Sequence, residues 1–511
     1  MRQWIACFSI CFSILGALVI PVAMAQQDSP EALKQAYQEA LEHQKRDQNL
    51  KAAEIFFNIY TANRELRDAA LSKVTENLIE AGYMNAASYF FIKTLQSNDR
   101  NAIQRVLIKL PDMIETVGGD LLRPYVLRHT RESDYDADTK NHFFYFLGKD
   151  HLLKGDVAES IRALNQVHSG SGVLPAAMYL KGTALAILGQ TDSAIYAFSY
   201  CARNSSSYRS KLHAFRREPE DLKARCTASL ARVYYQKGDH DQAEQTWDDI
   251  PKESFVWTDI LFEQAWNAYA RKDYNRALGK LVTYRSPLLK FVFNPEVDVL
   301  RAQSYLMLCR YSDVEKVTIE FNKNYGDVGA IIKRFLLSHE RDLGAFYKLA
   351  KAVFHRKIYT ENKLEKVMNR FIRGPYFASQ YNQELTTATE LAKIRNISKS
   401  SEGFAGFVEK VLTWRLKTIR LLGGLFVKNS LLDVYQELLA NLDKMSFIKL
   451  EMLKNAKTKL ERAALKKSND DRYESVSISR KGHQYYWSFN GEFWIDELGD
   501  YVFGLPSECG S

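Results

Sequence analysis

Hydrophobic positions recur at steps of three and four residues along most of the chain, which is the spacing of one face of an α-helix. The segments Leu343–Ile358 and Leu431–Lys467 follow this pattern. The second is long enough to project as one helix or to fold back as a helical hairpin. The pattern predicts an all-α protein.

The helical pattern also repeats every 34 residues. Two segments 34 residues apart show the repeat: residues 144–164 read FYFLGKDHLLKGDVAESIRAL, and residues 178–198 read MYLKGTALAILGQTDSAIYAF. A small residue recurs in what would be the first helix of each unit, at Gly148, Gly182, Ala231, Ala265 and Ala302. A second small position follows twelve residues later, at Ser160, Ala194, Ala243 and Ala277, with Val314 as a departure. Small residues at this spacing let two antiparallel helices cross closely, so stacked hairpins are predicted and these residues are structural.

This spacing resembles the tetratricopeptide repeat (TPR) family, which implies a TPR-like α-solenoid. In that family, partners bind along the concave face through motif positions five, nine and twelve. The residues predicted here to bind a partner are Tyr145, Lys149, Tyr179, Arg232, Tyr235, Phe262, Trp266 and Tyr269, and the last repeat places Val299, Gln303 and Leu306 at the same positions. Their aromatic character suits an apolar peptide or helix, while the alternative is that the rings form core between repeats.

One step breaks the period, because Gly182 and Ala231 are 49 residues apart. The extra length falls at 203–219, between Cys201 and Cys226. A disulfide between these two cysteines is predicted to close the insertion, and two buried thiols are the alternative. The redox state of Cys309 and Cys509 is left open.

The first 25 residues have the pattern of a signal peptide, with Arg2, an apolar run from Ile5 to Val22 and the small-x-small sequence Ala23-Met24-Ala25. Cleavage after Ala25 and a periplasmic or secreted mature protein are expected. The alternative is an uncleaved N-terminal anchor.

Charge and repeat pattern divide the remainder into a TPR-like array at 26–326, a basic helical region at 327–470 and an aromatic, acidic tail at 471–511. Residues 341–420 hold 16 Lys or Arg and 7 Asp or Glu, which equals the net charge of +9 of the whole chain. In an exported protein the accessible partners are acidic proteins, lipid headgroups or wall polymers, and not nucleic acid. The alternative is a solvated helical surface.

The tail contains YYWSFNGEFW at 485–494. Asn490-Gly491 between two aromatic runs predicts a tight β-hairpin, which needs a surface to lie on. We expect the tail to dock on the basic helices at 341–420 through an interface of Tyr486, Trp487, Phe493 and Trp494, because residues 482–511 carry five acids and no Lys or Arg. The alternative is that these rings are held out for another protein.

The tail sequence YYWSFNGEFWIDELGDY also resembles a C-terminal signature of exported TPR proteins of gliding and predatory bacteria, including those tied to adventurous gliding motility machinery. That resemblance implies a scaffold in a cell-envelope machine.

Motifs for chemistry are missing from the sequence: there is no phosphate loop, dinucleotide fingerprint, Cys-x-x-Cys, His-Glu-x-x-His or Gly-x-Ser-x-Gly. We therefore expect a non-enzymatic scaffold or adaptor with no catalytic, cofactor-binding or metal site, and with protein partners in the cell envelope. The alternative function is an accessory factor whose basic helices contact membrane or wall polymer.

Overall fold

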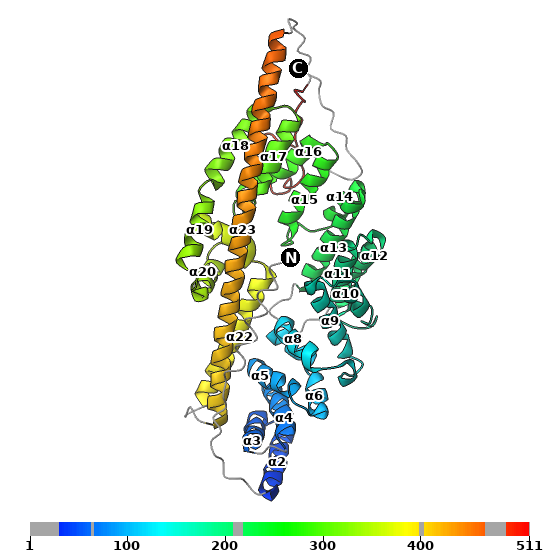
Figure 1. Cartoon of the computed structure of the whole chain (residues 1–511), viewed down its shortest axis with the longest axis vertical. Coiled ribbons are helices and arrows are strands. Elements are labelled where there is room, and N and C mark those ends of the chain that lie inside the picture. The colour runs from blue at the N-terminus through cyan, green and yellow to red at the C-terminus, as the bar shows by residue number, and fades with distance from the viewer. Residues whose placement is uncertain (1–29, 63–65, 208–217, 398–402, 466–486, 510–511) are drawn as a thin grey trace. The chain divides into compact units, whose positions relative to one another are not determined.

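The computed structural model describes residues 30–62, 66–207, 218–397, 403–465 and 487–509. The signal sequence, Tyr486 and most of the insertion at 203–219 lie outside these ranges. The described chain is an all-α solenoid with two short strands near its C-terminus (Figure 1). It forms two compact units: residues 1–233 with 379–419, and residues 234–378 with 420–511.

The first unit is built from successive helices that pair as hairpins. They are α2 (Pro30–Lys45), α3 (Asn49–Ala62), α4 (Arg67–Glu80), α5 (Met84–Leu95), α6 (Arg100–Leu107), α7 (Leu110–Val117), α8 (Gly119–His129), α9 (Lys140–Lys154), α10 (Val157–Leu164), α11 (Leu174–Ile187), α12 (Thr191–Asn204) and α13 (Glu218–Lys237) up to Val233, with short 3₁₀ turns at Glu132–Asp134 and Ser205–Ser207.

The second unit continues the hairpins and adds further helices. Its elements are α14 (His240–Asp248), α15 (Trp257–Ala270), α16 (Tyr274–Val282), α17 (Pro295–Met307), α18 (Tyr311–Tyr325), α19 (Val328–Ser338), α20 (Leu343–His355), α21 (Lys363–Ile372), strands β1 (Trp487–Ser488) and β2 (Tyr501–Val502), and 3₁₀ turns at Thr283–Arg285 and Pro287–Leu289. Two helices contribute to both units, namely α22 (Pro375–Ile397) and the 63-residue α23 (Gly403–Leu465).

The small repeat positions lie where the helices of a hairpin cross, as predicted. A Cβ on Gly148 would lie 2.4 Å from Leu164, and one on Gly182 would lie 2.8 Å from Phe198. Ala265 and Ala302 are fully buried. These positions therefore set the close approach of each helix pair, and their structural interpretation is confirmed.

The turn inside each hairpin uses one residue in the left-handed region. Gly155, Gly189 and Gly238 take φ of 89°, 72° and 82°, and the same place in the next two hairpins is held by Lys272 and Cys309, at 62° and 55°. A left-handed residue at the end of the first helix satisfies its last carbonyls and reverses the chain. A non-glycine residue pays a conformational cost there, so Cys309 occupies an unusual position for a cysteine.

In the first unit, α22 and α23 cover the aromatic face of the N-terminal hairpins. Phe407 of α23 lies 5.1 Å from the ring of Phe57, 5.6 Å from Tyr89 and 5.9 Å from Phe90, and Phe404 lies 5.3 Å from Phe57. These rings belong to one core that also includes Val408, Val411 and Leu412. Dispersion and burial in this cluster hold α23 against α3 and α5.

Charged side chains fix the position of α22 and α23 on those hairpins. The Glu390 carboxylate, from α22, accepts hydrogen bonds from the backbone N–H groups of Asn85 and Ala86 at 2.9 and 3.0 Å, in the first turn of α5. Arg415, from α23, donates to the Val117 carbonyl at the end of α7 (3.1 Å) and to Asn85 Oδ1 (2.9 Å). An anion at a helix N-terminus and a cation at a C-terminus both complement the helix dipole.

Burial perturbs both groups. It raises the pKa of Glu390, although its hydrogen bonds to Asn85 and Ala86 act in the opposite direction. Burial also lowers the pKa of Arg415 to about 10, against the effect of the Glu390 charge. The network is therefore costly to break, because either partner alone would leave a buried charge uncompensated.

In the second unit, α23 packs on α17, α18 and α20. Its buried residues Met445, Ile448 and Met452 share a core with Val317 and Phe321 of α18. Farther back along α23, a Cβ on Gly424 would lie 1.9 Å from the Leu343 carbonyl oxygen, so only glycine permits this crossing with the start of α20.

Candidate functional site

The predicted partner-binding residues of the first unit are already engaged within it. Lys149 lies 2.8 Å from Asp120 of α8 in an ion pair, and burial raises the pKa of the neighbouring Tyr145 to about 12. Tyr179 packs edge-on against Phe198 at 5.9 Å. Arg232 is exposed on α13. Tyr145, Lys149 and Tyr179 are thus half-buried inside the array, and Arg232 is the accessible residue of the four.

In the second unit the predicted aromatic residues form a chain of edge-to-face contacts. Phe262 and Trp266 lie 6.3 Å apart, and Trp266 and Tyr269 lie 5.6 Å apart. All three are half-buried against the core between α15, α16 and α17. Tyr235 packs separately against His240 and Trp247, at 5.4 and 6.4 Å. These rings contribute to core between repeats, which was the alternative interpretation, and each keeps part of its surface accessible.

The α17 part of this face has an occupant from the same chain. Val299 and Leu306, at motif positions five and twelve, are buried in one cluster with Met445, Ile448 and Met452 of α23. Burial raises the pKa of Tyr269, and the nearby Tyr274 and the charge of Glu451 on α23 act in the same direction. An apolar helix was the expected kind of ligand for these positions, and α23 supplies one intramolecularly.

The C-terminal tail forms a platform on the second unit, and we use that name for residues 487–509. Its backbone crosses α16 directly over Gly279, where a Cβ would lie 1.8 Å from the carbonyl oxygen of Tyr501. Asn275 accepts from Leu505 N–H through its side chain (3.0 Å) and from Phe503 N–H through its carbonyl (3.2 Å). The platform is therefore held along its backbone, and not only by side chains.

Further contacts fix the middle and the C-terminal end of the platform. The sulfur atoms of Cys509 and Cys309 are bonded across a separation of 200 residues. Ion pairs link Arg310 to Glu508 at 3.4 Å and Lys252 to Asp500 at 3.3 Å. A disulfide that closes so long a loop restricts the unfolded chain strongly.

Some rings of the platform are buried and others are left in solvent. Tyr501 and Leu498 are buried, and Phe489, Phe493 and Phe503 pack around Tyr501. The exposed fractions of Trp487, Trp494 and Ile495 are 45%, 57% and 73%. Trp487 is the strand partner of Tyr501, and the Tyr501 hydroxyl accepts from Trp494 N–H at 2.8 Å. The two exposed tryptophans are thus anchored to one buried tyrosine.

The platform corrects three expectations from the sequence. The strands pair in parallel, Trp487 with Tyr501 and Ser488 with Val502, so the prediction of a β-hairpin turning at Asn490-Gly491 is wrong. The tail docks on its own chain, as its aromatic content predicts, but on α15–α18 and not on the basic segment at 341–420. Backbone fit over Gly279 and the Cys309 bond decide the landing surface, because exposed charges are weak and screened.

The expected interface residues also need correction. Phe493 is half-buried, while Trp487 and Trp494 are exposed and do not supply the buried area. Tyr486 lies outside the described residues. The buried area comes from Leu498, Tyr501 and Val502, which follow the aromatic run and which the sequence pattern did not single out.

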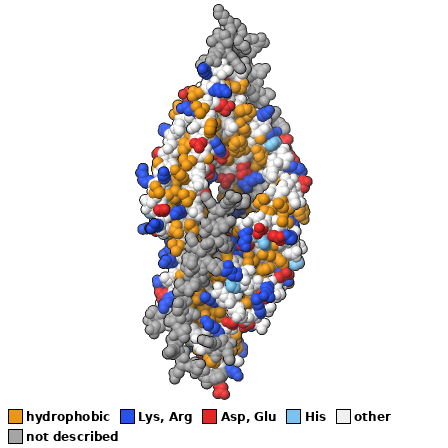
Figure 2. Space-filling view, in the orientation of Figure 1, with side chains coloured by type: hydrophobic (Ala, Val, Ile, Leu, Met, Phe, Trp, Pro, Cys, Tyr) orange, Lys and Arg blue, Asp and Glu red, His pale blue; other side chains and the backbone are white. Residues whose placement is uncertain are grey.

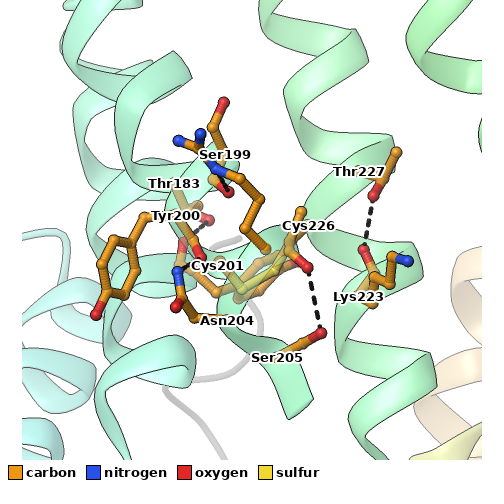
Figure 3. Close-up of a disulfide and its surroundings, with 12 residues drawn as sticks. Thr183, Ser199, Tyr200, Cys201, Asn204, Ser205, Lys223, Cys226 and Thr227 are labelled. Atoms are coloured by element: carbon orange, nitrogen blue, oxygen red, sulfur yellow. Dashed lines mark hydrogen bonds between the residues drawn. A yellow bond between two sulfur atoms is a disulfide. The ribbon is translucent and has the colours of Figure 1, made fainter. Parts of the chain in front are cut away.

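The second cysteine pair is the one that brackets the insertion. Cys201 and Cys226 are bonded, with their Cα atoms 5.9 Å apart (Figure 3). Both are fully buried in the core between α11, α12 and α13. Around them, Asn204 donates to the Tyr200 carbonyl at 2.8 Å and Thr227 to the Lys223 carbonyl at 2.9 Å. The bond joins the helices on both sides of the insertion.

The described ranges hold no group of three or more His, Cys, Asp or Glu side chains placed to bind a metal ion. In the same part of the chain, every helix is too short or too polar to cross a membrane.

The sequence matches no protein-family model and no curated protein. Among solved structures, the apo form of RapI is similar with a TM-score of 0.32 and 12% identity, covering 76% of this chain and 97% of that one. A circular tandem repeat protein with novel repeat topology and enhanced subunit contact surfaces is similar with a TM-score of 0.14 and 13% identity, covering 83% of this chain and 91% of that one. Similarities this low assign no function.

Proposed function

We propose that the protein is a non-enzymatic, periplasmic scaffold or adaptor that holds protein partners in a cell-envelope complex, and that the C-terminal platform is its main binding surface. The observation that carries the proposal is the exposure of Trp487, Trp494 and Ile495 on a platform whose backbone is fixed to α16. Exposed aromatic side chains on a rigid support bind partners at low entropic cost.

Export is supported by the signal-like N-terminus and by the two disulfides, because disulfides persist in oxidising compartments. The finer assignment, to gliding motility machinery, rests on the resemblance of the tail to exported TPR proteins of gliding bacteria. It makes motility complexes the first place to look for the partner.

A protein partner is favoured over an anionic polymer because part of the basic excess at 341–420 is neutralised locally. Within the second unit Lys363 pairs with Asp327 and Arg370 with Glu437. Arg415 is buried in the first unit. On the face seen in Figure 2, hydrophobic side chains form separate patches with Lys and Arg between them.

The test compares partner capture by the full-length protein with capture by Trp487→Ala/Trp494→Ala, using envelope extracts at high salt. The matched control is Leu337→Ala, which removes an exposed side chain of the same unit from α19. We expect the tryptophan variant to lose its captured proteins and keep its melting temperature, while Leu337→Ala retains both. Capture by the tryptophan variant equal to wild type would exclude the platform as the binding surface.

Location is tested separately. Cell fractionation with N-terminal mass spectrometry should find the mature chain beginning at Gln26 in the periplasm, with all four remaining cysteines oxidised. Salt-labile sedimentation with wall material, in place of salt-resistant protein capture, would favour the accessory-factor alternative.

A further inference from the structure

Helix α23 is apolar on two opposite faces in the second unit. The inner face carries Met445, Ile448 and Met452, which are buried against α17 and α18. The outer face carries four large side chains in solvent: Leu439, Phe447, Leu450 and Leu453, with exposed fractions of 42%, 71%, 64% and 51%. A surface helix normally has one apolar face, and a helix that is apolar on both is covered on both.

The exposed side chains lie on one strip of the helix. At 3.6 residues per turn, Leu439, Phe447, Leu450 and Leu453 fall within an arc of about 120°. They span four turns, or about 21 Å along the axis. Single exposed apolar side chains are common, but a contiguous strip marks an interaction surface.

Three charged residues lie on this strip and its C-terminal continuation: Asp443, Lys454 and Lys457. Asp443 and Lys454 are both exposed, and within the described residues neither makes an ion pair. Their positions are symmetric, because they are equally far from a point between Ile448 and Lys449. Phe447 and Leu450 are symmetric about that same point.

This shared centre is what an antiparallel pair of identical helices requires. In a two-fold interface, each residue meets the residue at the mirrored distance from the axis, and flanks of the same side come together. A two-fold axis at the centre would place Asp443 opposite Lys454 of the partner subunit and Phe447 opposite Leu450 of the partner subunit. Lys457 would face Ala440 of the partner subunit and so meet no like charge.

We infer that the outer face of α23, from Leu439 to Lys457, binds the same face of a second copy of this chain in an antiparallel, two-fold dimer. The face carries Asp443 and Lys454 at mirrored positions, with Lys457 opposite an uncharged residue, so it complements itself and not a uniformly acidic or basic partner. Because the strip is short, the interface is smaller than the standard size and the dimer is weak. This self-association is independent of the platform and of the compartment.

The test measures sedimentation velocity of the full-length protein from low micromolar to the highest soluble concentration. We expect reversible dimerisation of the wild type. Asp443→Lys and Lys454→Asp each place like charges opposite one another at two symmetric positions, and each should raise the dissociation constant by about tenfold. The double variant Asp443→Lys/Lys454→Asp reverses both charges together and should restore dimerisation to near the wild-type level.

Asp433→Lys is the control, because it makes the same charge change on an exposed position of α23 outside the strip. It should leave the dissociation constant unchanged. Circular dichroism melting of every variant checks that the fold is intact, and all the changed side chains are exposed. A wild type that stays monomeric throughout, a dimer unaffected by the single variants, or a double variant no better than the singles would each overturn the inference. A wild type that forms no dimer but binds anionic vesicles through Phe447 would overturn the inference too.

Discussion

Replacing Gly279 by alanine should release the platform from α16. The added Cβ would lie 1.8 Å from the Tyr501 carbonyl oxygen and 2.8 Å from the Val502 Cα. Both obstacles are backbone atoms, so no side-chain rotation relieves the overlap. The tail has to retreat by more than 1 Å to restore an ordinary contact, and its hydrogen bonds to Asn275 and Thr283 are lost with it.

Two effects of opposite sign set the magnitude. Alanine in a helix interior is favoured over glycine by about 0.5–1 kcal/mol. Overpacking costs about 1–3 kcal/mol, and undocking also exposes Leu498 and Tyr501, each worth about 1.5–3 kcal/mol when fully buried. The lost burial of these two side chains amounts to about 3–6 kcal/mol, so after the gain from alanine we expect a net loss of about 2–5 kcal/mol when the tail undocks.

The decisive assay is amide hydrogen exchange at Gly499, Phe503 and Leu505, whose N–H groups bond to Thr283 and Asn275. All three should exchange faster in Gly279→Ala. Site-resolved exchange is preferred over one melting curve because a chain with two compact units need not unfold in a two-state manner.

Gly329→Ala is the matched control. Its Cβ would make ordinary contacts with Tyr435 at 3.6 Å and Leu438 at 3.8 Å in the same unit, so it should raise stability by less than about 1 kcal/mol and leave the tail unchanged. If Gly279→Ala behaves like this control, with equal stability and unchanged exchange, the tail does not cross α16 as described.

Two further predictions concern the disulfides and the buried carboxylate. Replacing Cys309 and Cys509 by serine should lower the free energy of unfolding more than replacing Cys201 and Cys226 by serine. The entropic upper limits are about 5 and 3.5 kcal/mol for loops of 200 and 25 residues. Urea unfolding of both variants measures the two losses, and equal losses would contradict this prediction. Burial raises the pKa of Glu390 above its unfolded value of 4.5, so the folded state binds the proton more tightly. The protein therefore loses stability as the pH rises from 4.5 through the folded-state pKa of Glu390. Glu390→Gln should flatten this decline in pH-dependent urea unfolding, and an unchanged slope would refute the assignment.

Local patterns in the sequence predicted the repeats well. The spacing of Gly148 and Gly182 located the helix crossings, because these crossings depend on residues close in sequence. Cys201 and Cys226 lie on either side of the insertion, and this position in the sequence predicted the disulfide that the structure contains. These features need only the geometry of one hairpin and its neighbour.

Contacts between distant segments could not be predicted in the same way. Glu390 and Arg415 meet Asn85 across more than 300 residues, and nothing in the local pattern of either helix marks its partner. The platform was placed wrongly because net charge was used to choose its landing surface, while backbone fit at Gly279 decides it. A signal for the second disulfide was present, since Cys309 and Cys509 were the two cysteines left once the first pair was assigned.

The first compact unit is discontinuous in sequence, and this sets the order in which the protein is completed. Its N-terminal hairpins end at Val233, but the helices that cover Phe57, Tyr89 and Phe90 lie at 379–419. At a synthesis rate of about 5–20 residues per second, Phe407 follows Val233 by about 9–35 s. During that interval the aromatic face is open to chaperones and proteases. A chain that stalls before Phe404 cannot close it at all, so the quality control of the N-terminal half is governed by the arrival of the C-terminal half.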